Sequence, residues 1–257
     1  MGFSSDDWEV VFGLPGRDLL LSGLWITLQL AFYAIILSTI LGMLVALGRV
    51  TKQRKHAPLR WLLTAYVEFF RNVPLVVQLV FWGFAVFSLP AVQSFFEPLN
   101  FVYSNAFIAG VLGLAVYTSA YIAEVFRSGL QSIPKGQMEA ARASGLSYWP
   151  TMFLVIIPQV IRGTIGALGN QYIGATKNTS LVLFLGVTDL VFQAQQIEAM
   201  TFKGIQAFTA VAAIFVVICV TEALILGLIE KRLSLSSPKG RTKPTPATIT
   251  SVIRTQA

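Results

Sequence analysis

The sequence is short of charge. Aspartate, glutamate, lysine and arginine make up 12% of its 257 residues, against about 25% in soluble domains. The shortage is concentrated in five stretches without any charged residue, which are 19–48, 72–96, 98–123, 143–161 and 204–221. Most of them reach or approach the roughly 20 apolar residues that cross a bilayer as a helix. The sequence therefore argues against a water-soluble enzyme and predicts an all-α integral membrane protein.

Cysteine and histidine are almost missing as well. Cys219 is the one cysteine and His56 the one histidine, so no disulfide can form within the chain and no metal cluster or histidine-based triad can be assembled. We expect Cys219 to be a small core residue and His56 to be solvated. The sequence also lacks the GxxxxGK[ST] pattern of a phosphate-binding loop. We therefore expect no cofactor in this chain, and any energy source must come from another chain.

The net charge of +7 is not spread evenly. Basic residues gather after the first, third and last apolar stretches, in residues 49–60, 127–142 and 231–254, whereas the other connections carry mostly acids. This alternation follows the positive-inside rule of membrane proteins. It argues against a nucleic-acid partner and predicts a multi-pass protein with its N-terminus outside and its C-terminus inside.

Termini on opposite sides require an odd number of crossings. We predict five transmembrane helices, at about 21–48, 62–89, 106–126, 159–176 and 208–229. The apolar segment 181–197 is interpreted as a short or re-entrant helix on the outer side, because a sixth crossing would place the basic tail outside. Residues 1–18 would then be an external segment, 19–232 the membrane domain and 233–257 a disordered cytoplasmic tail rich in serine, threonine, proline and lysine.

Proline and charge spacing predict local detail within these spans. Pro74 lies inside the second apolar run, where we expect the helix to bend or restart. Glu68 and Arg71 are three residues apart, as are Glu124 and Arg127, so each pair can form an ion pair on one helical face.

The connection between the third and fourth spans, residues 132–158 (the elbow), predicts two short helices. Residues 135–144 read as a helix that Gly145 ends, Ser147 can cap the next helix, and Pro158 should interrupt it so that the crossing restarts at Gln159. Such an elbow is either an ordinary interfacial loop or a rigid surface that a soluble partner grips.

The residues of the elbow favour the second reading, because they resemble the EAA motif of ATP-binding-cassette importer permeases. The motif has Glu-Ala-Ala, three residues, glycine, nine residues, then two aliphatic residues around any residue, and proline. The matching positions are Glu139, Ala140, Ala141, Gly145, Val155, Ile157 and Pro158. Val155 and Ile157 are mild departures, since the pattern prefers isoleucine and leucine there.

The resemblance covers residues 19–232 and is strongest to permeases of polar amino acid uptake systems. It includes the stretches 64–78, 117–127 and 168–181, and 67–78 is especially similar to glutamate/aspartate permeases. The resemblance implies a type I importer permease fold in the bacterial inner membrane and no enzymatic activity. It also implies two permease subunits, a cytoplasmic ATPase dimer and an external amino-acid-binding protein. Whether the second permease is a copy of this chain or a similar sister chain stays open.

The resemblance implies that the elbow contacts the ATPase. The coupling residues would be Glu139, Ala140, Ala141 and Gly145.

Polar residues in the apolar spans are the candidates for a transport pathway. Lys177 lies 15 residues after Arg162, which is about 22 Å of helix, so one of them is expected inside the roughly 30 Å hydrocarbon core. Arg162 reads as an interface anchor, and Lys177 either faces the pathway or snorkels or pairs. A helix break at 177–180 would offer free N–H groups to a substrate carboxylate. The candidate substrate-binding residues are Thr118, Tyr121, Asn170, Gln171, Lys177, Asn178, Thr179 and Ser180, with helix packing as the alternative for the small polar ones.

The charge count favours an acidic or neutral polar amino acid as substrate. The nearest carboxylates considered, Glu68 and Glu124, each have a cation three residues on, which leaves none for a basic side chain. The resemblance leans towards glutamate or aspartate. A permease for basic amino acids, a secondary carrier or channel that works alone, and a membrane anchor for a soluble complex remain as alternatives.

Overall fold

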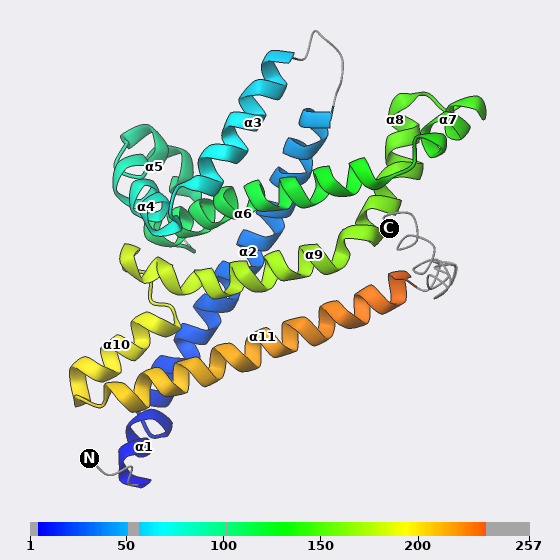
Figure 1. Cartoon of the computed structure of the whole chain (residues 1–257). Helices are drawn as coiled ribbons and strands as arrows, with labels where there is room; N and C mark the ends of the chain where they lie inside the picture. Colours follow the sequence, from blue (N-terminus) through cyan, green and yellow to red (C-terminus); the bar gives the residue numbers. More distant parts are fainter. Residues whose placement is uncertain (1–4, 51–56, 101, 235–257) are drawn as a thin grey trace, which may run out of the picture.

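The computed structural model describes residues 5–50, 57–100 and 102–234, and in these ranges the chain consists of helices and short connections (Figure 1). The helices are α1 (Ser5–Phe12), α2 (Gly16–Val50), α3 (Ala57–Asn72), α4 (Leu75–Val80), η2 (Phe81–Val86), α5 (Pro90–Phe96), η3 (Glu97–Leu99), α6 (Asn105–Ser132), α7 (Lys135–Ala143), α8 (Tyr148–Thr151), η4 (Met152–Ile156), α9 (Ile157–Asn178), η5 (Thr179–Leu185), α10 (Leu190–Thr201) and α11 (Gly204–Ser234). His56, which we expect to be solvated, and nearly all of the predicted tail, 233–257, lie outside the described residues.

Four continuous helical runs are long and apolar enough to cross a membrane, and a fifth is bent. The continuous runs are Gly16–Val50, Asn105–Ser132, Tyr148–Leu185 and Gly204–Leu233. The bent one joins α3 to α4 and η2 at an angle of 110°. The five predicted apolar segments are confirmed in this sense, whereas the orientation of the termini stays a prediction.

The bend in the second segment lies at the predicted proline. α3 ends at Asn72, and Pro74 stands immediately before α4. The side-chain amide of the buried Gln78 donates to the carbonyl oxygens of Phe70 and Val73, both at 2.9 Å. Because a carbonyl freed at a helix break needs a partner in an apolar environment, Gln78 stabilises the bend.

The largest helix–helix contact joins α2 and α6. The buried face of α2 carries small residues at helical spacing, including Ala34, Ser38, Gly42 and Ala46, and small residues let two backbones approach closely in a membrane. A β-carbon at Gly42 would lie 2.7 Å from Ile122 Cγ2 of α6.

The fourth span begins earlier than predicted and continues further. The chain stays helical through Pro158, because the proline occupies the first turn of α9, where its missing N–H is not needed. The predicted interruption is instead a π-helical stretch, η4, just before α9. Residues 181–185 continue α9 as the 3₁₀ helix η5, so they are part of the span rather than of a separate helix.

The short helix expected after this span is α10. Gly186, with φ of 76°, turns the chain, and the Asp189 side chain caps α10 by accepting from the Phe192 N–H at 3.0 Å. The Leu190 N–H donates to Thr27 Oγ1 of α2 at 3.1 Å. The helix packs with α1, α2 and α11 at the end opposite to α7 and α8 (Figure 1). A short, non-crossing helix is thus confirmed, although it is shifted to Leu190–Thr201.

Packing at Gly42 generates a stability prediction. Gly42→Ala places a methyl group 2.7 Å from Ile122 Cγ2 and 2.9 Å from the Ser119 carbonyl oxygen, so we expect a loss of about 1–3 kcal/mol from overpacking. Gly163→Ala is the matched control, since no atom lies within 4 Å of the added carbon. The midpoint of thermal unfolding in detergent should fall for the first variant and be unchanged or higher for the second; equal midpoints would contradict this account of the α2–α6 contact.

The cap of α10 generates a pH prediction. Burial raises the pKa of Asp189 to about 6, against the opposing effect of the N–H groups that it accepts from. The folded state thus binds the proton more tightly than the unfolded state, whose pKa is about 3.9. This contribution to stability is fully present below about pH 4 and is lost as the pH rises through about 6. Between about pH 5 and 7.5 we expect a loss of about 1 kcal/mol. Asp189→Asn, which keeps a capping oxygen, should unfold thermally with a flatter pH profile; the same slope in both proteins would refute the assignment.

Candidate transport site and coupling loop

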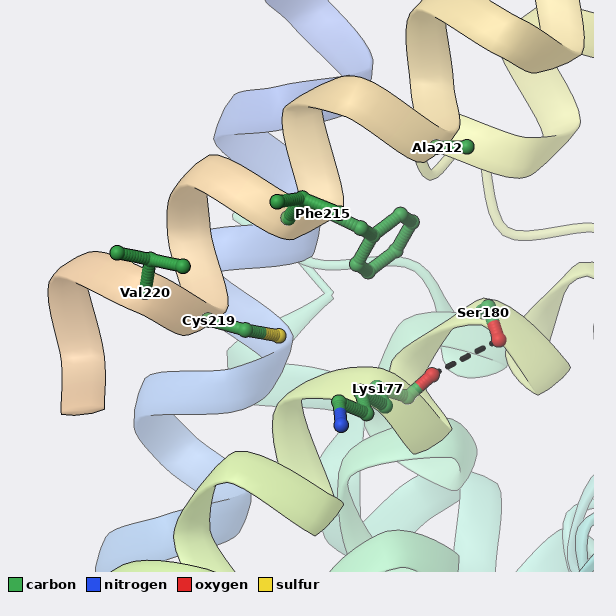
Figure 2. A pocket seen from close by; sticks show the side chains of 7 residues that line it. Lys177, Ser180, Ala212, Phe215, Cys219 and Val220 are labelled. Carbon is green, nitrogen blue, oxygen red and sulfur yellow. Dashed lines mark hydrogen bonds between the residues drawn. The ribbon is translucent and has the colours of Figure 1, made fainter.

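A cavity of about 500 Å³ opens between the end of α9 and the middle of α11 (Figure 2). Its polar side chains, Lys177 and Ser180, come from α9 and η5. Its apolar wall comes from α11, where the residues follow the helical spacing i, i+3, i+4, i+7 and i+8. These residues are Ala212, Phe215, Val216, Cys219 and Val220. The expectation that Cys219 is a core residue is therefore wrong, because it is only partly buried and lines this cavity.

The helix does not open at residues 177–180. The Thr179 N–H bonds to carbonyl oxygens of the preceding turn, and the hydroxyls of Thr179 and Ser180 donate back to the carbonyls of Thr176 and Lys177 at 2.7 and 2.8 Å. The predicted break is a change from α to 3₁₀ helix, so these N–H groups are not free for a ligand. Lys177 is the cationic group that the cavity offers to an anion.

Among the other predicted site residues, none lines this cavity. Thr118 on α6 is buried, and its hydroxyl has no hydrogen-bond partner within the described part of the chain. Asn170 is exposed, and Gln171 and Asn178 are half-buried on α9. Their predicted contact with substrate stays a prediction.

Tyr121 belongs to a different group of contacts. Its hydroxyl accepts from Tyr117 at 3.1 Å and donates to the Arg71 carbonyl at 3.3 Å. The Arg71 guanidinium lies 5.4 Å from the centre of the Tyr121 ring, which is cation–π distance. The predicted Glu68–Arg71 ion pair is wrong, since the two residues form none in the described ranges. The partner of the Arg71 guanidinium is therefore the Tyr121 ring of α6 instead of the Glu68 carboxylate.

The Glu124–Arg127 pair is confirmed and is part of a larger cluster. Glu124 Oε2 lies 2.7 Å from Arg127 on the same helix, and its other oxygen contacts Arg49 at the end of α2. Arg127 also donates to Gln131 at 3.0 Å. The cluster joins α2 to α6 shortly before the elbow, which begins at Ser132.

Glu222 is a functional candidate that the sequence reasoning missed. It is half-buried on α11 and accepts a hydrogen bond from the Thr176 hydroxyl of α9, the residue before Lys177. Its Oε2 atom is buried without a partner among the described residues. The signal was present, because Glu222 is a lone acid inside the last apolar run. The charge count from the sequence, which considered only Glu68 and Glu124 as carboxylates near the pathway, was therefore wrong.

The elbow has the predicted geometry at Gly145. α7 ends at Ala143, and Gly145 has φ of 88°. The Gly145 N–H donates to the Arg142 carbonyl at 3.0 Å and the Leu146 N–H to the Ala141 carbonyl at 3.2 Å, which is a Schellman motif. Ser147 stands at the predicted N-cap of α8, although its side chain makes no capping hydrogen bond.

The elbow presents polar residues outward. Glu139 and Ala140 are exposed on α7, whereas Ala141 is buried. Met138, on the same helix, packs against the cluster that η4 and α9 form with α6. The elbow projects from the helical bundle at the end away from α10 (Figure 1), as a surface for a partner would.

Comparison with known proteins shows which family has this architecture. A model of the family described as "binding-protein-dependent transport system inner membrane component" matches residues 38–235. The chain is 38% identical over 217 residues to a probable glutamine ABC transporter permease of Bacillus subtilis, covering 84% of this chain and 94% of that protein. It is 34% identical over 218 residues to a glutamate transport system permease of Corynebacterium glutamicum, covering 84% and 94%.

The fold has a close counterpart among solved structures. A crystal structure of an amino acid ABC transporter with histidines superposes with a TM-score of 0.72 at 32% identity, covering 90% of this chain and all of that one. Permeases of this family are transport subunits rather than enzymes, and they work with an ATPase and a binding protein. The chain therefore belongs to the family of binding-protein-dependent transport system inner membrane components, as a multi-pass permease with the type I ABC importer fold.

Proposed function

We propose that this chain is the permease subunit of an ATP-driven importer of polar amino acids, with neutral or acidic substrates favoured. The observation that carries the proposal is the cavity between α9 and α11, in which Lys177 and Ser180 face an apolar wall. Its volume of about 500 Å³ falls within the range of about 300–1,000 Å³ for small-molecule sites. The glutamine and glutamate systems named for the relatives agree with this substrate class.

Lys177 is the proposed binding group for the substrate carboxylate. It forms no ion pair within the described ranges, and an unpaired cation in a membrane span is expensive unless it serves a cavity or a ligand. The other substrate-binding residues predicted from the sequence, namely Thr118, Tyr121, Asn170, Gln171, Asn178 and Thr179, belong to this proposal as pathway residues beyond the cavity.

The elbow is the proposed contact with the ATPase. Glu139 and Ala140 are exposed, and the Gly145 turn fixes α7 relative to α8, which leads without a break into the fourth span. The proposed assembly has two permeases, either two copies of this chain or this chain and a sister, together with an ATPase dimer and an external amino-acid-binding protein.

The functional test is uptake by the reconstituted system. Proteoliposomes that contain this chain, its ATPase and its binding protein should accumulate radiolabelled glutamine or glutamate when ATP is supplied. Arginine is the comparison substrate. Uptake that persists without the ATPase would favour a secondary carrier, and preferential uptake of arginine would favour the basic-substrate alternative.

Gly145 provides the test of coupling. At φ of 88° a side chain costs about 1–2 kcal/mol, so Gly145→Val should disfavour the native elbow. We expect ATP-driven uptake to fall about five- to thirtyfold, the factor to which that energy corresponds, while ATP hydrolysis continues. Gly163→Val is the matched control, because Gly163 lies in α9 outside the elbow, without a positive φ and with open space around it. Normal uptake by the Gly145 variant would contradict a coupling role.

A further inference from the structure

The face of α11 that meets α9 carries acidic residues as well as apolar ones. Cys219 lines the cavity, and Glu222 follows it one turn later on the same face, next to Thr176. Leu226 packs on Gly169, and the Glu230 carboxylate lies at Gly166. The two helices are thus antiparallel neighbours, and Glu222 lies at the level of Thr176 and Lys177.

The thiol of Cys219 lies within electrostatic reach of two opposite charges. Lys177 and Glu222 both lie close enough to act on it electrostatically, yet they form no ion pair with each other in the described ranges. Glu222 Oε2 is buried without a hydrogen bond in the same part of the chain. Because a buried carboxylate oxygen without a partner is unfavourable, this arrangement suits a ligand that brings its own cation.

We propose that Glu222 receives the α-ammonium group of an amino acid whose α-carboxylate binds Lys177, so that the α9–α11 cavity is a site for the zwitterionic head group. This inference rests on the proposed function. It extends that function by adding Glu222 as a binding residue, the α-ammonium group as the part of the ligand that Glu222 binds, and a rule for which side chain of the substrate amino acid fits. Because Lys177 and Glu222 neutralise the head group and Phe215, Val216 and Val220 form the wall, the described lining of the cavity offers no further charge, and a neutral side chain fits best.

The chain carries its own reporter for this site. Cys219 is its single cysteine and lines the cavity, so a bound ligand should shield the thiol without any engineered residue. In proteoliposomes containing the complete transporter, the rate of modification by N-ethylmaleimide is measured by mass spectrometry of the peptide that contains Cys219. The probes are L-glutamine, L-glutamate and L-arginine, each beside its N-acetyl derivative and its α-amide.

The expected result is protection that needs both charges of the head group. At ten times its half-maximal concentration a ligand leaves about one tenth of the sites free, so labelling should slow about tenfold. L-glutamine should protect better than L-arginine, and N-acetyl-L-glutamine and L-glutaminamide should fail. Absence of protection by all three amino acids, or equal protection by the N-acetyl derivatives, would overturn the proposal without any variant being made.

Glu222→Gln tests the residue itself. Removing one partner of a buried charge pair costs at least about 2 kcal/mol, or about thirtyfold in affinity, so the concentration for half-protection should rise by that factor. Glu230→Gln, on the same face of α11, is the matched control and should leave it unchanged. Unchanged protection and uptake in Glu222→Gln would overturn this inference and leave the proposed function standing. Absence of ATP-dependent amino acid uptake by the unsubstituted transporter would instead overturn the proposed function.

Discussion

The membrane allows no unpaired backbone groups in contact with lipid, and the irregular points of this chain show how that constraint is met. At the bend beside Pro74 the Gln78 amide binds two carbonyl oxygens. Where α9 changes to η5, the Thr179 and Ser180 hydroxyls bind the carbonyls of the preceding turn. At these two points the chain therefore changes direction or helix type with side-chain partners for four backbone carbonyl groups.

The close contact between α2 and α6 holds these two helices together. Small residues on α2 allow the approach, and the Arg49–Glu124–Arg127 cluster joins the two helices near the elbow. One carboxylate lies between two guanidinium groups there, so removing Glu124 would break both ion pairs and leave two cations without their common counter-charge. Packing and charge thus fix the same pair of helices at separate points, and α9 packs on this pair.

Patterns within one segment were predictable, and contacts between segments were not. The apolar runs, the bend at Pro74 and the turn at Gly145 follow from hydropathy and backbone chemistry that act locally. The partner of Arg71 is an aromatic ring on another helix, which the spacing of Glu68 could not reveal. Likewise, the importance of Glu222 depends on Thr176 being opposite to it. Sequence spacing indicates which residues share a face but does not indicate which face meets another helix.

The continuity of the fourth span links the elbow to the candidate site. The helical run Tyr148–Leu185 begins at α8 and contains Lys177 near its far end, without a gap in its described backbone. The opposite wall of the cavity belongs to α11, which is a separate span connected through α10 (Figure 1). If a partner displaces α7 and α8, the movement reaches Lys177 along one helix, whereas it reaches Glu222 on α11 through the contacts between two helices, such as the hydrogen bond from Thr176. A shift of α9 against α11 would then change the separation of the two charges, and with it the affinity for any ligand that bridges them. The same geometry that leaves the charges unpaired would thus let partner movement control binding.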